Sequence, residues 1–201
     1  MPLAGRTKRQ VLAEFRNAEI LQAARRVFAA RGFEGACVED IAHVAGVAKG
    51  TVYLYYASKG ALYRAALKRG LAEMCASIRR RVESAPSVRG KLRAFVETKL
   101  AHFEEHRDFF RIYSSAFSRS PGPLCCHRDL RAFQEEQLRI LESALASGGN
   151  VRGIRPQTAA RAMFDVTRGL IERRLCGESR EATEKEAAAL LDLVWKGFAR
   201  R

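Results

Sequence analysis

The side chains with the clearest capacity for chemistry lie within Val38–Leu62, VEDIAHVAGVAKGTVYLYYASKGAL. Small, hydroxylic and aromatic residues stand there at positions where a helix packed into a core would carry leucine or isoleucine. The polar groups are the amine of Lys49 and the hydroxyls of Thr51, Tyr53 and Tyr55. Amines and hydroxyls donate hydrogen bonds to phosphates and base edges, so the pattern favours DNA recognition over catalysis.

The elements that must position these groups are two short helices around a glycine turn. The predicted helices cover residues 38–45 and 49–55, and Gly46 lies between them. Ser58 is the predicted N-cap of the next helix, because a serine hydroxyl accepts a hydrogen bond from the free amides of a first turn. This order is typical of a helix-turn-helix that places its second helix in the major groove of DNA.

Other reactive side chains have weaker interpretations. His102 and His106 are four residues apart with Glu105 between them. That spacing can bind a metal, but a solvated helix face is the favoured interpretation. The adjacent cysteines at 125–126 leave a redox role open, although thiols at a loop edge without a function are favoured. The chain has no Gly-rich phosphate loop, GxSxG, HExxH or paired-carboxylate motif, so we expect no enzyme, no metal and no cofactor.

The charge of the chain is strongly positive. It has 201 residues, 47% of them hydrophobic, with a formal net charge of +14 and a pI of about 10.2. Residues 1–70 hold 12 Lys+Arg against 5 Asp+Glu, so a third of the chain carries half of the excess. This balance favours a polyanionic partner. Two alternatives stay open: a solvated basic surface, and a charge-driven protein that binds nucleic acid or anionic membrane surfaces without sequence preference.

Hydropathy argues against a membrane protein. No segment approaches the roughly 20 apolar residues that span a bilayer. The basic N-terminus lacks the apolar core of a signal peptide. We therefore expect no membrane partner, a cytoplasmic location and reduced thiols.

The helical period runs through almost the whole chain and predicts an all-α protein. Residues 1–10 are expected to form a basic arm. The predicted helices cover about 16–31, 38–45, 49–55, 59–83, 88–106, 108–117, 128–146, 156–176 and 183–200. We place an N-terminal domain with the three-helix helix-turn-helix in residues 1–67 and a larger C-terminal helical domain in residues 68–201.

The segment Ile20–Leu67 resembles the DNA-binding domain of the TetR (tetracycline-repressor) family of bacterial transcriptional regulators. An ordered set of short motifs carries the resemblance: Gly32-Phe33, Asp40-Ile41-Ala42, Ala45-Gly46-Val47, Gly50-Thr51, Tyr53, Tyr55 and Ser58-Lys59. The resemblance implies a sequence-specific regulator of double-stranded DNA. Repression of transcription is favoured over activation. A small-molecule effector would release the protein from a near-palindromic operator.

The resemblance also assigns DNA contacts to individual residues. Lys49 would reach a phosphate or a guanine edge, and Gly50 would let the backbone approach the DNA closely. Tyr53 and Tyr55 would donate hydrogen bonds from their hydroxyls to phosphates. Lys59 would bind the DNA backbone at a helix N-terminus. The full set of expected contacts is His43, Ala48, Lys49, Gly50, Thr51, Tyr53, Tyr55 and Lys59.

Three positions depart from the pattern of the family. Cys37 stands where Thr or Ser usually caps the first helix of the motif, and a thiol is expected to be a poor cap, costing up to about 1 kcal/mol. Ala48 replaces a serine and removes one hydroxyl. Gly60 replaces an acidic residue that would suit the dipole of the following helix.

The remaining helices resemble the family only in their lengths and order, without matching sequence motifs. The resemblance implies a homodimer formed by the last two helices. The expected dimer residues are Met163, Val166, Leu170, Leu191, Val194, Trp195 and Phe198. The middle helices would enclose a mostly apolar effector. The expected pocket residues are Phe95, Phe103, Phe110, Tyr113, Phe117 and Phe133.

Overall fold

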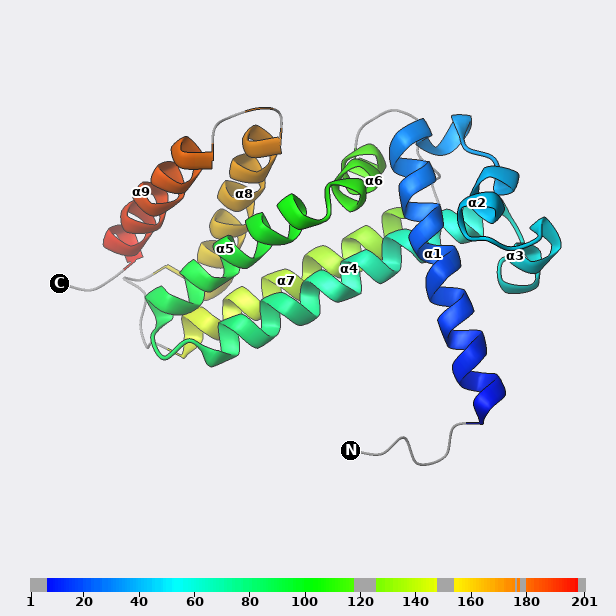
Figure 1. The fold of residues 1–201 in the computed structure, drawn as a ribbon. Coiled ribbons are helices and arrows are strands. Elements are labelled where there is room, and N and C mark those ends of the chain that lie inside the picture. Colours follow the sequence, from blue (N-terminus) through cyan, green and yellow to red (C-terminus); the bar gives the residue numbers. More distant parts are fainter. Residues whose placement is uncertain (1–6, 118–125, 148–153, 176, 178–179, 199–201) are drawn as a thin grey trace. The chain divides into compact units, whose positions relative to one another are not determined.

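The protein is helical throughout the part of the chain that the structure, a computed structural model, describes (Figure 1). That part comprises residues 7–117, 126–147, 154–175, 177 and 180–198. The helices are α1 (Lys8–Gly35), α2 (Val38–Val44), α3 (Lys49–Tyr55), α4 (Lys59–Ser84), α5 (Val88–Glu105), α6 (Arg107–Phe117), α7 (His127–Ala146), α8 (Pro156–Leu175) and α9 (Arg180–Phe198). The predicted all-α class is confirmed. The predicted loop over 118–124 lies outside the described residues.

The chain forms two compact units. Unit 1 comprises Met1–Gly70 and Arg107–Asp129, and unit 2 comprises Leu71–His106 and Leu130–Arg201. Unit 1 therefore contains α1, α2, α3 and the start of α4, together with α6 from the middle of the chain. The periodicity of the sequence shows that α6 is a helix, but it does not show that α6 packs with the N-terminal helices.

The first helix is longer than the sequence predicts. It begins at Lys8, so residues 8–10 belong to a helix and not to an arm. A reciprocal cap explains this start: the Gln10 amide donates to Thr7 Oγ1 at 3.3 Å, and the Thr7 amide donates to Gln10 Oε1 at 2.8 Å. Such a capping box satisfies two amides of the first turn. The regular helix breaks at the expected position, where Gly32 has a φ of +69°.

The core of unit 1 joins α1, α4 and α6 around one tyrosine. Tyr63 is almost fully buried, and its ring lies edge-on to Phe28 at 5.0 Å and to Phe33 at 5.2 Å. Its hydroxyl donates to the carbonyl oxygen of Ile112 at 3.2 Å. Because a buried hydroxyl needs a partner, this bond fixes α6 against α4 within the unit.

A close approach between α4 and α6 requires a glycine. A Cβ at Gly70 would lie 2.3 Å from Cδ2 of Phe109, a ring with no exposed surface. Gly70→Ala is therefore expected to destabilise the protein by about 1–3 kcal/mol, since overpacking outweighs the gain in helix propensity. Thermal unfolding would show a lower Tm. Gly60→Ala is the control, because its Cβ would meet only Ser58 Oγ, at 3.8 Å. A Gly70→Ala protein as stable as its parent would contradict this packing.

Unit 2 is a bundle in which α8 packs on α9 and both pack on α5. Its buried aromatic residues include Phe95, Phe103, Phe133 and Phe164. Four polar side chains, Lys99, His102, Gln137 and Thr167, are also buried in it. Within the described residues, no helix is both long and apolar enough to cross a membrane.

Candidate nucleic-acid interface

The turn between α2 and α3 has the geometry that the sequence predicts. Gly46 adopts a φ of +64°, which side chains with a Cβ rarely adopt. Its amide donates to the carbonyl oxygen of His43 at 3.1 Å, and the next amide, of Val47, donates to that of Ala42 at 3.0 Å. These bonds end α2 and set the direction in which α3 starts.

The N-terminus of α2 is capped by a thiol. The Asp40 amide donates to Cys37 Sγ at 3.4 Å, and the thiol donates to Asp40 Oδ2 at 2.8 Å. The thiol's hydrogen bond lowers the pKa of the Asp40 carboxyl, and the nearby Arg31 guanidinium, which pairs with it, lowers that pKa further. The position that the sequence marks as a weak cap is therefore supported by an ion pair from α1.

One side of α3 lies in the core and the other is open. Val52 is almost fully buried, whereas Ala48, Lys49 and Gly50 at the start of the helix are exposed. Tyr53 is 45% exposed. Of the other predicted contact residues, Thr51 and Tyr55 are half-buried and His43 on α2 is exposed. Ala48 makes no side-chain cap bond. The helix thus presents an amine, a hydroxyl and a bare stretch of backbone on an accessible face.

Lys49 is not a free cation in this structure. Its ammonium pairs with the carboxylate of Glu39 on α2 and lies 5.9 Å from the centre of the Tyr53 ring. The hydrogen bond to Glu39 raises the pKa of Lys49, and the same bond lowers the pKa of Glu39. Binding a phosphate through Lys49 therefore requires the amine to leave or share this carboxylate.

The carboxylate of Glu39 is expected to oppose DNA binding. Glu39→Gln removes a negative charge beside the DNA-facing amine, so DNA affinity should rise about 3- to 10-fold at 0.1 M salt. Fluorescence anisotropy with a labelled duplex measures this change. Glu34→Gln, an exposed acid in the same unit, is the charge-matched control. Weaker DNA binding by Glu39→Gln would show instead that the pair orients Lys49 for contact.

Lys59 makes contacts within the protein. Its ammonium donates to the carbonyl oxygens of Glu34 at 3.3 Å and Ala36 at 3.1 Å, and lies 4.7 Å from the centre of the Phe33 ring. An ammonium has three donors, so two are used within the protein. Lys59 therefore ties the start of α4 to the end of α1. A DNA contact by this residue stays a prediction.

Two exposed apolar residues belong to this surface and were missed by the sequence prediction. Leu54 is 85% exposed on α3, and Val44 is 47% exposed at the end of α2. Leu54 follows the buried Val52 by two residues, which is more than half a turn of a helix, so helical spacing alone could have placed it on the open side. Apolar side chains in the major groove contact the methyl group of thymine.

The predicted pocket residues do not gather at one described cavity. Phe95, Phe103 and Phe133 are buried in unit 2. Tyr113, buried, and Phe110, half-buried, belong to α6 in unit 1. The side chain of Phe117 lies outside the described residues.

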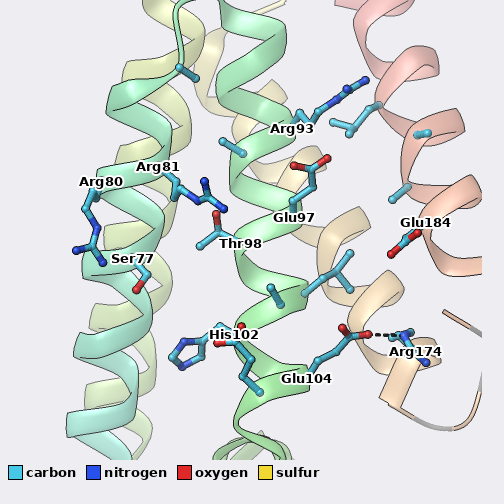
Figure 2. A pocket seen from close by; sticks show the side chains of 18 of the residues that line it. Ser77, Arg80, Arg81, Arg93, Glu97, Thr98, His102, Glu104, Arg174 and Glu184 are labelled. Carbon is cyan, nitrogen blue, oxygen red and sulfur yellow. Dashed lines mark hydrogen bonds and ion pairs between the residues drawn. The ribbon is translucent and has the colours of Figure 1, made fainter. Parts of the chain in front are cut away.

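A described cavity of about 950 Å³ lies in unit 2, and none of the predicted aromatic residues lines it. Figure 2 shows arginine and glutamate side chains around it, and Arg174 Nε donates to Glu104 Oε1 at 2.6 Å. Its labelled lining residues are Ser77, Arg80, Arg81, Arg93, Glu97, Thr98, His102, Glu104, Arg174 and Glu184. Charges of both signs lie beside apolar side chains such as Leu100, Ala101 and Leu191, so the lining of this cavity is mixed in polarity.

The predicted dimer residues divide into three groups. Met163, Leu170 and Leu191 are buried within the single chain. Val166 and Trp195 are half-buried, and the side chains of Val194 and Phe198 lie outside the described residues. The sequence also missed Leu193, which is 67% exposed on α9.

Comparisons with known proteins agree with this geometry. The model of the tetR family of bacterial regulatory proteins matches residues 20–66. MftR, a proposed mycofactocin biosynthesis transcriptional regulator of Mycobacterium tuberculosis, is 31% identical over 184 residues, which cover 90% of each chain. YvdT of Bacillus subtilis, an uncharacterized HTH-type transcriptional regulator, is 26% identical over 86% of this chain and 91% of its own.

Solved structures share the whole fold. FadR from Bacillus subtilis, in complex with stearoyl-CoA, has a TM-score of 0.77 at 19% identity and covers 90% of this chain and 99% of its own. PfmR from Thermus thermophilus has a TM-score of 0.69 at 25% identity, with coverage of 90% and 99%.

The positive-φ turn, the open face of α3 and the separate helical unit define a helix-turn-helix transcriptional regulator that binds DNA. The chain belongs to the TetR family of bacterial regulatory proteins. The resemblance that the sequence predicts is thereby confirmed, and the relatives named here are transcriptional regulators.

Proposed function

We propose that this regulator is a repressor that binds a near-palindromic operator as a homodimer and is released by a small-molecule effector. The observation that carries the proposal is the open face of α3, on which Lys49, Gly50 and Tyr53 are accessible while Val52 anchors the helix in the core. A helix held in this way presents its first turn to the major groove.

In this proposal the contacts divide by chemistry. Lys49 and the hydroxyls of Thr51 and Tyr53 bind phosphates and fix the register of the protein on the duplex. Leu54 and Val44 add apolar contacts that select thymine methyl groups. The half-buried Tyr55 supports the helix and reaches the DNA backbone with its hydroxyl.

The homodimer would use the outer faces of α8 and α9. Ala162 is exposed and Val166 and Gly169 are half-buried along one side of α8, while Ala189 and Leu193 are exposed on α9. Small residues on one helix let a second helix approach closely, and a twofold axis makes the same surface serve both chains. The predicted dimer residues that are buried within the single chain then pack beneath this face and hold α8 and α9 together.

The effector would act by population shift. The fold of FadR holds stearoyl-CoA, and at 19% identity this likeness supports only that such a fold can enclose a ligand. We infer that the aromatic residues of α5 and α7 in unit 2 contact a largely apolar part of an effector. Such a ligand releases DNA when it binds better to a conformation whose two α3 helices do not fit the operator.

Selection from a random DNA library at physiological salt tests the function. The expected result is an enriched near-palindrome, bound about a thousandfold or more tightly than random DNA. Steep salt dependence without an enriched sequence would overturn the proposal and favour the charge-driven alternative. Sedimentation of the protein with the selected duplex gives the stoichiometry, and one chain per site would overturn the homodimer.

A further inference from the structure

A lysine lies inside the helical core of unit 2. Lys99 on α5 is 1% exposed, and its Nζ has no hydrogen-bond partner among the described residues. The amine lies 4.3 Å from the centre of the Phe164 ring and 5.6 Å from that of Phe95. Lysines almost never become fully buried without a partner, because removing an ammonium from water is costly.

Other buried polar side chains of unit 2 differ in whether they form hydrogen bonds. Thr167 on α8 is also fully buried, but its hydroxyl donates to the carbonyl oxygen of Met163 at 2.6 Å. Gln137 on α7 behaves like Lys99, with no exposed surface and no hydrogen-bond partner for either amide atom among the described residues. Buried polar atoms without a partner are rare in native proteins and call for an explanation. A ligand that supplies the missing partner is one.

The pattern along α5 places the lysine between two rings. Phe95, Lys99 and Phe103 follow each other at intervals of four residues, so they lie on one face of the helix. All three are buried, and none lines the 950 Å³ cavity of this unit. The face therefore offers apolar surface on both sides of a single amine.

The groups that act electrostatically on this amine do not pair with it. Three groups act on Lys99 electrostatically: Cys75 on α4, and Asp165 and Arg168 on α8. Neither the Asp165 carboxylate nor the Cys75 thiol forms an ion pair or a hydrogen bond with the amine. Burial lowers the pKa of Lys99 to about 7. A carboxylate brought into the core would favour the protonated amine and form a charge-assisted hydrogen bond with it.

We propose that Lys99 anchors the carboxylate of an amphipathic effector whose apolar body lies along Phe95, Phe103 and Phe164. This inference rests on the proposed effector-controlled function and names the chemical class of the effector. A mostly apolar molecule without a head group would leave the amine unsatisfied. The ligand opens this part of the core as it enters, in the way that a minor conformation becomes dominant when a ligand binds it.

Paired probes of equal length test the proposal. Full-length protein is titrated with dodecanoate and with dodecanol below their solubility limits, with thermal unfolding and calorimetry as readouts. Dodecanoate is expected to raise the Tm and to bind at least 10-fold more tightly than dodecanol. Lys99→Met should lose this preference, while Lys68→Met, an exposed lysine of unit 1, should keep it. Equal binding of both probes, or binding of neither dodecanoate nor octanoate nor hexadecanoate, would overturn the proposal.

A second readout covers the case in which Lys99→Met does not fold. Dodecanoate affinity of the parent protein should rise as the pH falls from 8.5 to 6.5, because the amine becomes protonated in this range. His102, on the same helix, is excluded as the cause if His102→Gln shows the same pH dependence. An affinity that does not change with pH would contradict the anchoring role.

The outcomes separate this inference from the proposed function. If a selected operator is released by some other compound equally well in the parent and in Lys99→Met, the function stands and the inference fails. If no operator is selected but dodecanoate binds through Lys99, the site stands and the proposed repressor function fails.

Discussion

Lys49→Ala is expected to weaken operator binding about 100-fold. Lys49 is the first residue of α3 and is exposed beside the bare backbone of Gly50. A homodimer makes the contact twice. Each charge-assisted bond to phosphate contributes about 1.4 kcal/mol, which is about tenfold in affinity. The partner Glu39 would lose its cation, and the uncompensated carboxylate would add to the loss.

The salt dependence of the same variant identifies the kind of contact. Loss of two phosphate contacts should reduce the slope of log K against log salt by about 2, with the same loss for operator and random DNA. Anisotropy titrations between 50 and 200 mM salt measure both quantities. Lys68→Ala, which removes the same charge from α4, is the control. A loss confined to the operator, with an unchanged slope, would show that Lys49 reads a base edge.

The second large effect concerns the stability of the free protein. Replacing the buried amine of Lys99 with the apolar side chain of methionine is expected to stabilise the protein, and the gain should depend on pH. Burial holds the pKa of Lys99 at about 7 in the folded state, while an unfolded lysine has a pKa of about 10.4. Between these values the unfolded chain binds more protons, so the free energy of unfolding rises with pH.

The expected size and the pH window follow from the same values. From pH 7.0 to 8.5 the free energy of unfolding of the parent should rise by about 1.5 kcal/mol relative to Lys99→Met. Cys75 does not change this difference: burial raises the pKa of its thiol to about 11, but the thiol is present in both proteins. Urea unfolding of both proteins at each pH measures the difference. A difference between them that is constant from pH 7.0 to 8.5 would show that Lys99 keeps its proton in the folded core.

These two predictions depend on very different amounts of sequence information. The position of Lys49 on an open helix face could be predicted from features that each involve only a few neighbouring residues. These features are the turn at Gly46, the cap at Ser58 and the spacing from the buried Val52. The Ala61 amide donates to Ser58 Oγ at 3.1 Å, as an N-cap serine requires. Short-range rules of helix geometry were sufficient for such features.

The partners of the site residues could not be predicted in this way. Lys59 binds the carbonyl oxygens of Glu34 and Ala36, which lie 25 and 23 residues earlier in the chain. Lys49 pairs with Glu39, which lies on the other side of the turn and 10 residues earlier in the chain. A flexible lysine reaches many acceptors, so the choice among them depends on how α1, α2 and α4 meet.

The sequence by itself therefore determined the all-helical class, the helix-turn-helix and the family, because local periodicity, caps and short motifs carry that information. Tertiary packing decided that α6 joins the N-terminal helices through Gly70 and Phe109. It also decided that Lys99 lies against Phe164 of α8 and not in water. A residue's helical position fixes the side of the helix it occupies, but which helix covers that side, and with which groups, depends on contacts between residues far apart in the chain.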